Sequence, residues 1–591
     1  MSNPLPDPLE PVDRFTDWYG FDTENDKAGK VTLAALVHES GNKDVWEGGG
    51  HFVECCEKRL SKQGKPVVIC HNLEYDLVNE FGVDRYSQMN LNYLKGRLIS
   101  ARLGNITFLD SFNHFRMALA EIGKSLGLQK LDFDIHSKDY VTMDAWICLQ
   151  VMTQARDYIA SLGGRIGTTS GSSAMSVWRY MTEDEFVTGP YDTPWARRGY
   201  YGGRVEIFRP ATECQILGYD AEGTAERAKD IRGYDINSMY PFVMMADFPE
   251  YMMEDSKLEK DQGMAEVTIA IPKNMYVAPL VWRTPTGALW YPVGVISGVW
   301  TYNEIRFAEK LGAKVLKVHR AFGCNSLVRP FDQFITTLYA KRKASKSASE
   351  KLFLKVVMNS LYGKIASKNQ VTRTVSRYNL EKSGSRRIKD VKWINYHRGL
   401  LDYTTPQQPY VNVYWGAMIT ANARLLLTDY LNKVPPHDLI YCDTDSVYCR
   451  NFKLPESTEL GEMKLEKTIS VMKVVQPKAY QIDETYRAKG VPKPRMSEDG
   501  SQLLIDFAQQ YIEQGMTEFQ APIRFRASLN SRRGNANQWV KHKKSQKSAY
   551  SAKQLSGDCY YPPVIGEQLD LLVEDSRSGG VGNKPKQTNT K

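Results

Sequence analysis

The chain has 591 residues, of which 42% are hydrophobic and 25% charged, and its formal net charge is +9. This length predicts roughly two to four compact units and excludes a small disulfide-stapled scaffold. No apolar run reaches the roughly 18 residues of a membrane span, and the N-terminal residues lack a secretory signal pattern, so we expect no membrane partner and a cytosolic location. The nine cysteines form no CxxC pair, which argues against a structural zinc site.

The first part of the chain alternates short β-like runs with helical patterns. The β-like runs are WYGFDTE, VTLAALV, PVVICHN and ITFLDSF, and residues 140–162 have helical spacing. Such alternation predicts a three-layer α/β domain, which we expect to end in the Gly/Ser-rich segment 162–173.

Four carboxylates of this domain could bind cations. Strand alternation puts Asp22 and Glu24 on one side of a strand, Asp76 follows the apolar run VVIC, and Asp144 lies near a helix start. If they converge, they could hold two cations, with Tyr140 orienting a hydrolytic water. Taken singly, each is better explained as a surface acid or a cap.

A second group of carboxylates occurs in a larger α/β unit with strand-like runs at 264–271 and 439–448. The latter predicts a β-hairpin whose tip carries Asp443 and Asp445, and Asp235 lies at the end of another apolar strand. Two carboxylates so close repel each other unless a cation or proton offsets the charge. The alternative is an ordinary Asx turn and a capped strand end.

The segment 330–366 has helical composition. Lys351, Lys355 and Asn359 follow one another at a spacing of four residues, and Tyr362 lies close to the same face. Such a stripe could bind a triphosphate through its lysines and a base pair through the ring. The alternative is a solvated helix edge.

Three later segments have unusual composition. Residues 367–409 are polar and lack a clear period, which is typical of an insertion. Residues 521–557 contain nine Lys or Arg and no Asp or Glu, which suits a polyphosphate partner, although a solvated basic segment is the alternative. Residues 575–591 are rich in Gly, Ser and Lys and are predicted to be disordered.

The motifs DINSMYP, KVVMNSLYG and YCDTDS resemble, in their usual order, the three polymerase motifs of family B DNA polymerases. This resemblance implies that Asp235 and Asp445 bind metal, that Asp443 supports them, and that Tyr240 is the steric gate against ribonucleotides. The residues that it implies as dNTP contacts are Tyr240, Lys351, Lys355, Asn359 and Tyr362.

The N-terminal motifs resemble the three exonuclease motifs of proofreading polymerases. The resemblance implies that Asp22, Glu24, Asp76 and Asp144 bind metal and that Tyr140 acts in catalysis. Together with the YYGG and KAY segments, it implies a set of DNA contacts: Asn72, Ser111, Phe112, Lys130, Tyr200, Gly202, Gly203, Lys478 and Tyr480. The implied cofactor is Mg²⁺, two ions per active site, with Mn²⁺ as an alternative.

By this resemblance the fold class is multidomain α/β, with a ribonuclease H-like exonuclease domain followed by a right-hand polymerase (palm, fingers, thumb) with insertions. The expected domains are the exonuclease 1–180, the palm 181–273 with its YxGG linker, a first insertion 274–328 like a terminal-protein region, the fingers 329–366, a second insertion 367–409 for strand displacement and processivity, the second part of the palm 410–490, the thumb and basic region 491–574, and a tail 575–591.

The short chain, the compact exonuclease motifs and the insertion 367–409 are similar to the protein-primed polymerases of phages and linear plasmids. The implied partners of a monomer are primer-template DNA, dNTPs and a terminal protein that primes synthesis, in a host cytoplasm if the replicon is viral. Two alternatives stay open: a family B polymerase that extends nucleic-acid primers, and a catalytically inactive DNA-binding protein.

Overall fold

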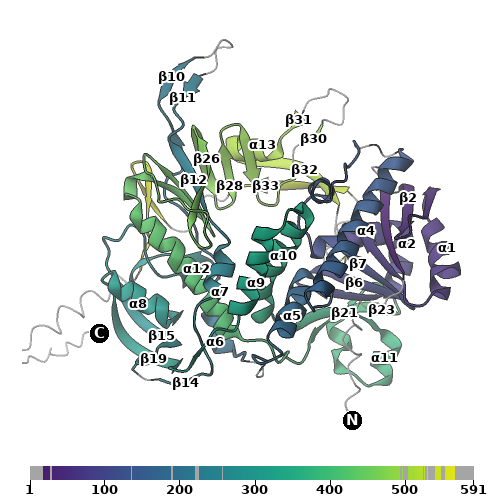
Figure 1. The fold of residues 1–591 in the computed structure, drawn as a ribbon, viewed down its shortest axis with the longest axis horizontal. Coiled ribbons are helices and arrows are strands. Elements are labelled where there is room, and N and C mark those ends of the chain that lie inside the picture. The colour runs from purple at the N-terminus through teal and green to yellow at the C-terminus, as the bar shows by residue number, and fades with distance from the viewer. Residues whose placement is uncertain are drawn as a thin grey trace, which may run out of the picture.

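The structure is a computed structural model that describes residues 17–26, 30–132, 134, 136–187, 191–219, 225–255, 257–492, 495–496, 504–522, 525, 529, 539–546 and 553–565. Figure 1 shows an N-terminal α/β body, in purple and blue, on one side of a central group of helices and a second body of sheets on the other.

The N-terminal body is built on a ten-stranded mixed sheet. Its strands, from one edge to the other, are β22 (Lys392–Trp393), β23 (Arg398–Thr404), β21 (Gln370–Ser376), β5 (Asn90–Leu94), β6 (Arg97–Leu103), β7 (Ile106–Asp110), β4 (Val67–Cys70), β1 (Trp18–Asn25), β2 (Val31–His38) and β3 (Lys43–Glu47). β4 runs parallel to β1 and β7, and the other pairs are antiparallel.

Helices cover both faces of this sheet. α4 (Lys138–Ser161) packs on one face, in a cluster with Trp18, and α1 (His51–Lys58) and α2 (Leu73–Gln88) pack on the other, in a cluster with Tyr19 and Phe21. Because neighbouring strand residues point to opposite faces, β1 supplies both clusters. The predicted three-layer α/β domain and the helix at 140–162 are therefore confirmed.

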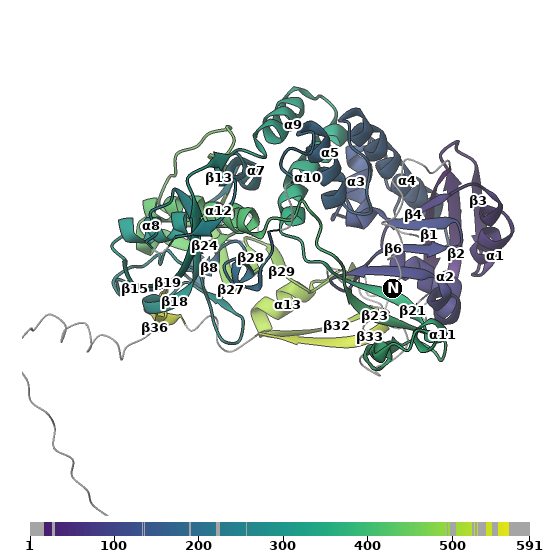
Figure 2. The same cartoon turned by 90° about the horizontal axis from the view of Figure 1, so that it is seen from below.

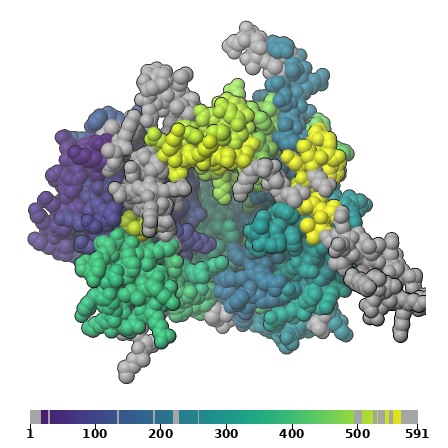
Figure 3. Space-filling model, turned by 180° about the vertical axis from the view of Figure 1, so that it is seen from behind, coloured from purple at the N-terminus to yellow at the C-terminus, as the bar shows by residue number. Residues whose placement is uncertain are grey.

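The segment 367–409 is ordered and joins this N-terminal sheet. Its strand β21 pairs with β5, where Thr372 faces Tyr93, and it also carries α11 (Arg377–Lys382). A distant part of the chain thus extends the sheet of the N-terminal body; Figure 3 shows the green segment against the purple surface.

The second body contains the predicted β-hairpin in a five-stranded antiparallel sheet. Its strands, in order, are β26 (Met463–Ile469), β12 (Ile231–Ile236), β25 (Ser446–Arg450), β24 (Leu439–Asp443) and β8 (Val205–Ile207). α12 (Val413–Lys433) packs against β25 and α7 (Met239–Met244). The hairpin expected at 439–448 is therefore confirmed.

A further five-stranded sheet takes two of its strands, β18 (Val293–Thr301) and β19 (Lys314–Cys324), from the segment 274–328. Its strands are β14 (Met253–Glu254), β19, β15 (Gln262–Ile271), β18 and β36 (Val564–Ile565). α8 (Tyr302–Lys310) packs on it. Because β15 pairs along its length with β18 and β19, this segment is continuous with the strand expected at 264–271, which is confirmed.

The segment 330–366 forms two helices, α9 (Asp332–Ala344) and α10 (Ala348–Ile365). α10 packs against α5 (Ser170–Met181), and its Phe353 ring lies 5.6 Å from Phe115 and 6.2 Å from Tyr158 of the N-terminal body. Figure 2 shows α9 and α10 between the two bodies. The helix that carries the Lys–Asn–Tyr stripe is therefore seated on the N-terminal domain.

The last part of the chain bridges the two bodies. A sheet of β9 (Ala211–Glu213), β27 (Val471–Gln476), β28 (Ala479–Ile482) and β29 (Thr485–Ala488) carries α13 (Phe507–Gln514), followed by the ribbon β32 (Met516–Pro522) and β33 (Trp539–Ser545). Beyond β32, Phe525 is buried 4.9 Å from Tyr86 of α2, as measured between ring centroids.

The basic segment 521–557 is described in part. Its described cations are Lys541, Lys543, Lys544 and Lys553; Arg524, Arg526, Arg532, Arg533 and Lys547 lie outside the described residues, as does the predicted tail 575–591.

The remaining described elements are short. They are η2 (Leu60–Lys62), η3 (Ser111–Asn113), α3 (Leu119–Ser125), α6 (Pro194–Arg198), β10 (Ile216–Tyr219), β11 (Ala225–Arg227), β13 (Phe248–Pro249), β16 (Trp282–Arg283), β17 (Leu289–Trp290), β20 (Leu327–Val328), η4 (Arg386–Asp390), η5 (Pro436–Asp438), β30 (Arg495–Met496), β31 (Leu504–Ile505), β34 (Gln554–Ser556) and β35 (Cys559–Tyr561). Among the described helices, none combines the length and apolar character needed to cross a bilayer.

Candidate active sites

The first candidate site lies where β12 meets the tip of the β24–β25 hairpin. Asp235 pairs in register with Ser446, and the Ile236 amide donates a hydrogen bond to the Asp445 carbonyl at 2.8 Å. Asp235 and Asp445, which are 210 positions apart in the chain, are therefore held side by side by the antiparallel pairing of their strands. This pair could bridge two cations.

The electrostatics of the pair show that its charge is only partly offset. Burial raises the pKa of Asp235 to about 7, and the nearby charges of Asp445 and Glu466 add to the shift, while Lys355 and Lys464 oppose it. Burial also raises the pKa of Asp445, against Lys355. The Lys355 charge thus reaches both carboxylates across the site.

Asp443, at the other side of the hairpin tip, has protein partners of its own. Lys478 Nζ lies 2.5 Å from its Oδ1, Thr444 Oγ1 donates to the same oxygen at 3.0 Å, and Tyr441 Oη donates to Oδ2 at 3.1 Å. The Lys478 amide in turn donates to Tyr441 Oη at 3.0 Å. Asp443 therefore anchors the tip, and the ring of Tyr480 packs 5.9 Å from that of Tyr441.

The YYGG segment touches this tip from the other side. The Thr444 amide donates to the Arg204 carbonyl at 2.7 Å, and a Cβ on Gly203 would lie 3.0 Å from Thr444 Cγ2. A side chain at position 203 would press on the turn between the two aspartates. The absence of a side chain at Gly203 therefore allows the YYGG segment to approach this turn closely. Around Gly202, a Cβ would meet nothing within 4 Å.

The predicted dNTP residues lie on two helices: Tyr240 on α7 and the other four on α10. On α10, Lys351 and Lys355 are exposed, and the side-chain Nδ2 of Asn359 donates to the Lys355 carbonyl at 2.8 Å. The Tyr362 ring stacks on Tyr240, with centroids 4.4 Å apart and planes 14° apart.

Tyr200 extends this aromatic wall. Burial raises the pKa of its hydroxyl to about 12, and Tyr362 is close enough to add to the shift. Three rings from three distant segments therefore meet beside Asp445, whose charge also raises the pKa of Tyr362.

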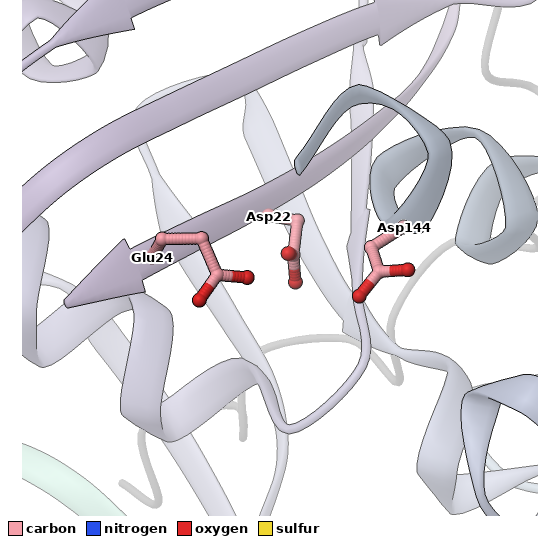
Figure 4. Close-up of side chains that lie close together, drawn as sticks. All are labelled: Asp22, Glu24 and Asp144. Carbon is pink, nitrogen blue, oxygen red and sulfur yellow. The ribbon is translucent and has the colours of Figure 1, made fainter. Parts of the chain in front are cut away.

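The second candidate site lies on the N-terminal sheet, where the carboxylates of Asp22, Glu24 and Asp144 offer oxygens that all lie within 4.8 Å of one another. Figure 4 shows Asp22 and Glu24 on β1 facing Asp144 on α4. Asp76, on α2, accepts a hydrogen bond at 2.8 Å from Thr23 Oγ1, and its charge raises the pKa of Asp22.

A glycine lets this cluster form. A Cβ on Gly20 would lie 2.0 Å from the Ala145 carbonyl oxygen, so the α4 backbone crosses β1 in contact with it. Because Gly20 and Asp22 share one face of β1, the same crossing brings Asp144 to Asp22.

One lysine contacts a carboxylate of the second site. Lys130 Nζ contacts Asp144 Oδ2 and lies 4.4 Å above the Tyr140 ring. Burial nevertheless raises the pKa of Glu24 to about 7 and that of Asp22 well above its usual range, with Asp76 and Asp144 adding to the latter. Four carboxylates against one lysine leave excess negative charge, and hard carboxylate oxygens suit Mg²⁺. The donor set therefore fits a divalent cation.

The predicted single-strand contacts lie at the ends of β4 and β7. Asp110 Oδ1 accepts hydrogen bonds from the amides of Asn72 and Phe112, at 3.0 and 2.9 Å. Ser111 is buried, and its hydroxyl donates to the Cys70 carbonyl at 3.0 Å. Phe112 is half-buried under the Arg97 guanidinium, 4.9 Å away.

Several neighbours of the first site are missing from the sequence-based set. Arg342, at the end of α9, lies 3.3 Å from Ser238 Oγ, two residues before Tyr240. The buried Arg424 donates to the carbonyls of Tyr201 and Gly202 at 3.1 and 2.9 Å and pairs with Glu304 at 2.6 Å. No local pattern marks these residues, because each is identified only by a partner 104 to 223 positions away.

Comparison with known proteins gives concordant results. Residues 119–397 match the family described as DNA polymerase type B, organellar and viral. The DNA-directed DNA polymerase of Enterobacteria phage PRD1 is 25% identical over 422 residues, which cover 67% of this chain and 70% of the phage protein. A probable DNA polymerase of Podospora anserina is 26% identical over 312 residues, which cover 46% of this chain and 24% of the fungal protein.

Solved structures show the same fold. Phi29 DNA polymerase complexed with single-stranded DNA superposes with a TM-score of 0.66 at 15% identity and covers 90% of this chain and 100% of that chain. Its complex with primer-template DNA and incoming nucleotide superposes with a TM-score of 0.64 at 14% identity, over 90% and 99% of the two chains. The expected fold class is thereby confirmed, and the chain is similar, over residues 119–397, to the type B DNA polymerases of the organellar and viral group.

Proposed function

We propose that this chain is a DNA-directed DNA polymerase that adds nucleotides at Asp235, Asp443 and Asp445 and removes them, in the 3′→5′ direction, at Asp22, Glu24, Asp76 and Asp144. The observation that carries the proposal is the pairing of β12 with β25, which places Asp235 beside Asp445 opposite the Lys355 charge.

In nucleotide addition, Asp235 and Asp445 would hold two Mg²⁺ ions. The ions supply activation of the 3′-hydroxyl and stabilisation of the leaving pyrophosphate. Lys351 and Lys355, four residues apart on α10, supply positive charge toward a triphosphate, while the Tyr240–Tyr362 stack gives the nascent base pair a flat wall. Because Tyr240 is packed on a neighbouring ring, it can exclude a 2′-hydroxyl by volume.

In strand trimming, Asp22, Glu24 and Asp144 would hold the metal, which supplies an activated water. Tyr140 and Lys130 orient groups at the Asp144 side, and Phe112 offers a ring on which a terminal base can stack. The half-buried position of Phe112 leaves one face of this ring partly accessible.

We further propose that replication is protein-primed and that the segment 367–409 contacts nucleic acid. This segment displays aromatic and cationic groups together: the Arg377 guanidinium lies 4.0 Å above Trp393 and 4.7 Å above Tyr396, and Tyr396 and Tyr378 are 71% and 67% exposed. Exposed rings beside arginines suit stacked, unpaired bases.

The test of the enzymatic proposal is a paired assay with Mg²⁺ on a primer-template and on single-stranded DNA labelled at its 5′ end. Extension of the first and 3′→5′ shortening of the second are expected. If the intact protein performs neither reaction, the catalytically inactive alternative holds.

The test of protein priming uses labelled dNTP, Mg²⁺ and a candidate terminal protein, for example a small basic protein encoded beside this chain. A covalent adduct of that protein with the nucleotide is expected. Extension of ordinary primers without any adduct would favour the alternative, a polymerase that uses nucleic-acid primers.

A further inference from the structure

The segment from Lys553 to Ile565 returns to the underside of the hairpin that carries Asp443 and Asp445. It follows the β32–β33 ribbon in the sequence, yet its contacts are with β8, with the residues after β8 and with β18. The C-terminal part of the chain therefore bridges the two bodies with the β32–β33 ribbon and then packs on the second body, which carries the β24–β25 hairpin.

Lys553 makes the deepest of these contacts. Its side chain is 2% exposed, and its Nζ lies 2.8 Å from Glu206 Oε1 and donates to the Ile207 carbonyl at 3.0 Å. A buried ammonium is tolerated only with close acceptors, so the position of this side chain is tightly fixed. Glu206 is equally enclosed, with 4% of its side chain exposed.

Glu206 connects Lys553 to the aspartate turn. Its Oε2 accepts a hydrogen bond from Arg204 Nε at 2.6 Å, and the Arg204 carbonyl accepts the one from the Thr444 amide at 2.7 Å. Burial acts to raise the pKa of Glu206, but Arg204 and Lys553 outweigh it and hold the pKa below its usual value. Glu206 is therefore an anion that needs both cations.

The strand register gives a second connection. Glu206 pairs with Cys442 and Val205 pairs with Asp443 across β8 and β24. A displacement of Glu206 would therefore move β8 against the strand that ends in Asp443.

Three more contacts hold the segment in place. Asp558 pairs with the buried Arg209, whose Nη2 also donates to the His437 carbonyl at 2.7 Å. The Tyr560 amide donates to the Phe208 carbonyl at 2.8 Å, and β36 pairs with β18 in parallel. Several contacts along its length therefore hold the segment in the fold, and Lys553 is one of them.

We propose that Lys553 is a positioning residue for nucleotide addition: its ammonium holds Glu206, and through Arg204 and β8 it fixes the turn that carries Asp443 and Asp445. The proposal rests on the polymerase function proposed above. Lys553 is buried, and a displaced metal-binding turn changes the rate of the chemical step more than dNTP binding, because the side chains proposed to contact the triphosphate directly lie on α10 and not on the turn.

The experiment compares full-length Lys553→Met with Lys433→Met. Lys433 is a matched control because it lies on the same body but pairs at the surface with Asp429, one helical turn away. For each variant, kcat and the dNTP KM of primer extension, the 3′→5′ exonuclease rate and the Tm are measured. Methionine keeps the unbranched chain and removes the charge.

For Lys553→Met we expect kcat to fall about 10- to 100-fold, as for a small misplacement of catalytic groups, with KM within about twofold and the exonuclease rate unchanged. Lys433→Met should match the intact protein in all four measurements. An unchanged kcat in Lys553→Met overturns the proposal, and so does a parallel loss of both activities with a lowered Tm, which indicates a merely structural lysine.

If Lys553→Met does not fold, Lys553→Arg replaces it, because arginine keeps the charge but moves the donors. Lowered kcat with a normal exonuclease rate then supports the proposal, and a kcat equal to that of the intact protein overturns it. Failure of the intact protein to extend a primer would instead reject the polymerase function itself.

Discussion

The two carboxylate sites are assembled by different means. In the exonuclease-like site, a helix from one part of the chain is laid across a strand, and the carboxylate group Asp22, Glu24 and Asp144 depends on that crossing. In the polymerase-like site, Asp235 and Asp445 are neighbours because their strands pair within one sheet. The first is a product of layer packing, and the second of backbone hydrogen bonding.

The sites also differ in how their charge is balanced. Within the described part of the chain, Asp22, Glu24 and Asp144 are the one group of three possible ligands that lie within 4.8 Å of one another, and Lys130 contacts one member. In the other site Lys478 pairs with Asp443, outside the Asp235–Asp445 pair. One chain therefore assembles two groups of carboxylates, one as a tight cluster that depends on a helix and the other as a more open pair that depends on strand pairing.

The largest expected effect is the separation of the two activities. Asp445→Ala should lower primer extension by about 10³-fold or more, because a metal ion contributes several kcal/mol to the chemical step, and should leave single-strand degradation intact. Asp22→Ala should do the reverse. Extension and degradation assays on both variants check this, and equal loss of both activities in either variant would mean that the two sites are not independent.

The next effect tests the helix crossing. Gly20→Ala places a Cβ against the backbone of α4, which cannot shift cheaply, so the exonuclease rate should fall about 100-fold while extension is largely kept. Gly203→Ala is the matched change in the other site. It meets only the Thr444 side chain, which can give way, and should lower extension by less than about tenfold. A normal exonuclease rate in Gly20→Ala would contradict the dependence of the exonuclease-like site on the helix crossing.

A smaller effect should follow from removing one hydroxyl in each site. Thr23→Val deletes the donor to Asp76, and Tyr441→Phe deletes a donor to Asp443. A hydrogen bond to a charged group contributes about 1.5–3 kcal/mol to stability. We expect the lower end of this range, about 1.5 kcal/mol, to affect the chemical step, so each change should slow its own reaction by about tenfold. The rates of both reactions are measured in each variant. A variant that slows the reaction of the other site, or slows both reactions equally, would contradict this expectation.

The smallest effect is a release of protons. The pKa values of Glu24 and Asp235 are about 7, so in the metal-free protein each is about half protonated at pH 7. Mg²⁺ needs the deprotonated form, and its binding should release at least a fraction of a proton per site at pH 7 and less at pH 8.5. Titration calorimetry in buffers of different ionisation enthalpy measures this. Glu24→Gln should reduce the release, and no buffer dependence would contradict the shifts.

The same shifts fix the sign of the stability change. Between the unfolded pKa of about 4 and the folded value of about 7, the folded carboxyls bind more protons than the unfolded ones. The stability of the metal-free protein should therefore fall as the pH rises from about 5 to 8, and Mg²⁺ should restore it. Thermal unfolding with and without Mg²⁺ tests this sign.

Local patterns of the sequence predicted many of the elements. The apolar runs before Asp235 and around the Asp443–Asp445 turn predict strands, and the spacing from residue 140 to 162 predicts α4, because side-chain alternation and helical period are properties of adjacent residues. The aspartates and the glutamate of both carboxylate sites could also be predicted from the sequence, because carboxylate oxygens are suitable ligands for a divalent cation. The segment 367–409 shows the limit of such patterns: it has no clear period, yet it forms three strands, of which β21 pairs with β5 of the N-terminal sheet.

Only the tertiary structure decided which residues meet. The contact of Gly20 with α4, the support of the YYGG carbonyls by Arg424, and the attachment of Lys553 to Glu206 each join residues more than 120 positions apart. Burial and the distance between charges depend on the packing of whole layers, and no local pattern encodes them. The sequence by itself therefore determined the chemistry that this chain can offer, and the fold decided where that chemistry is assembled and what holds it in place.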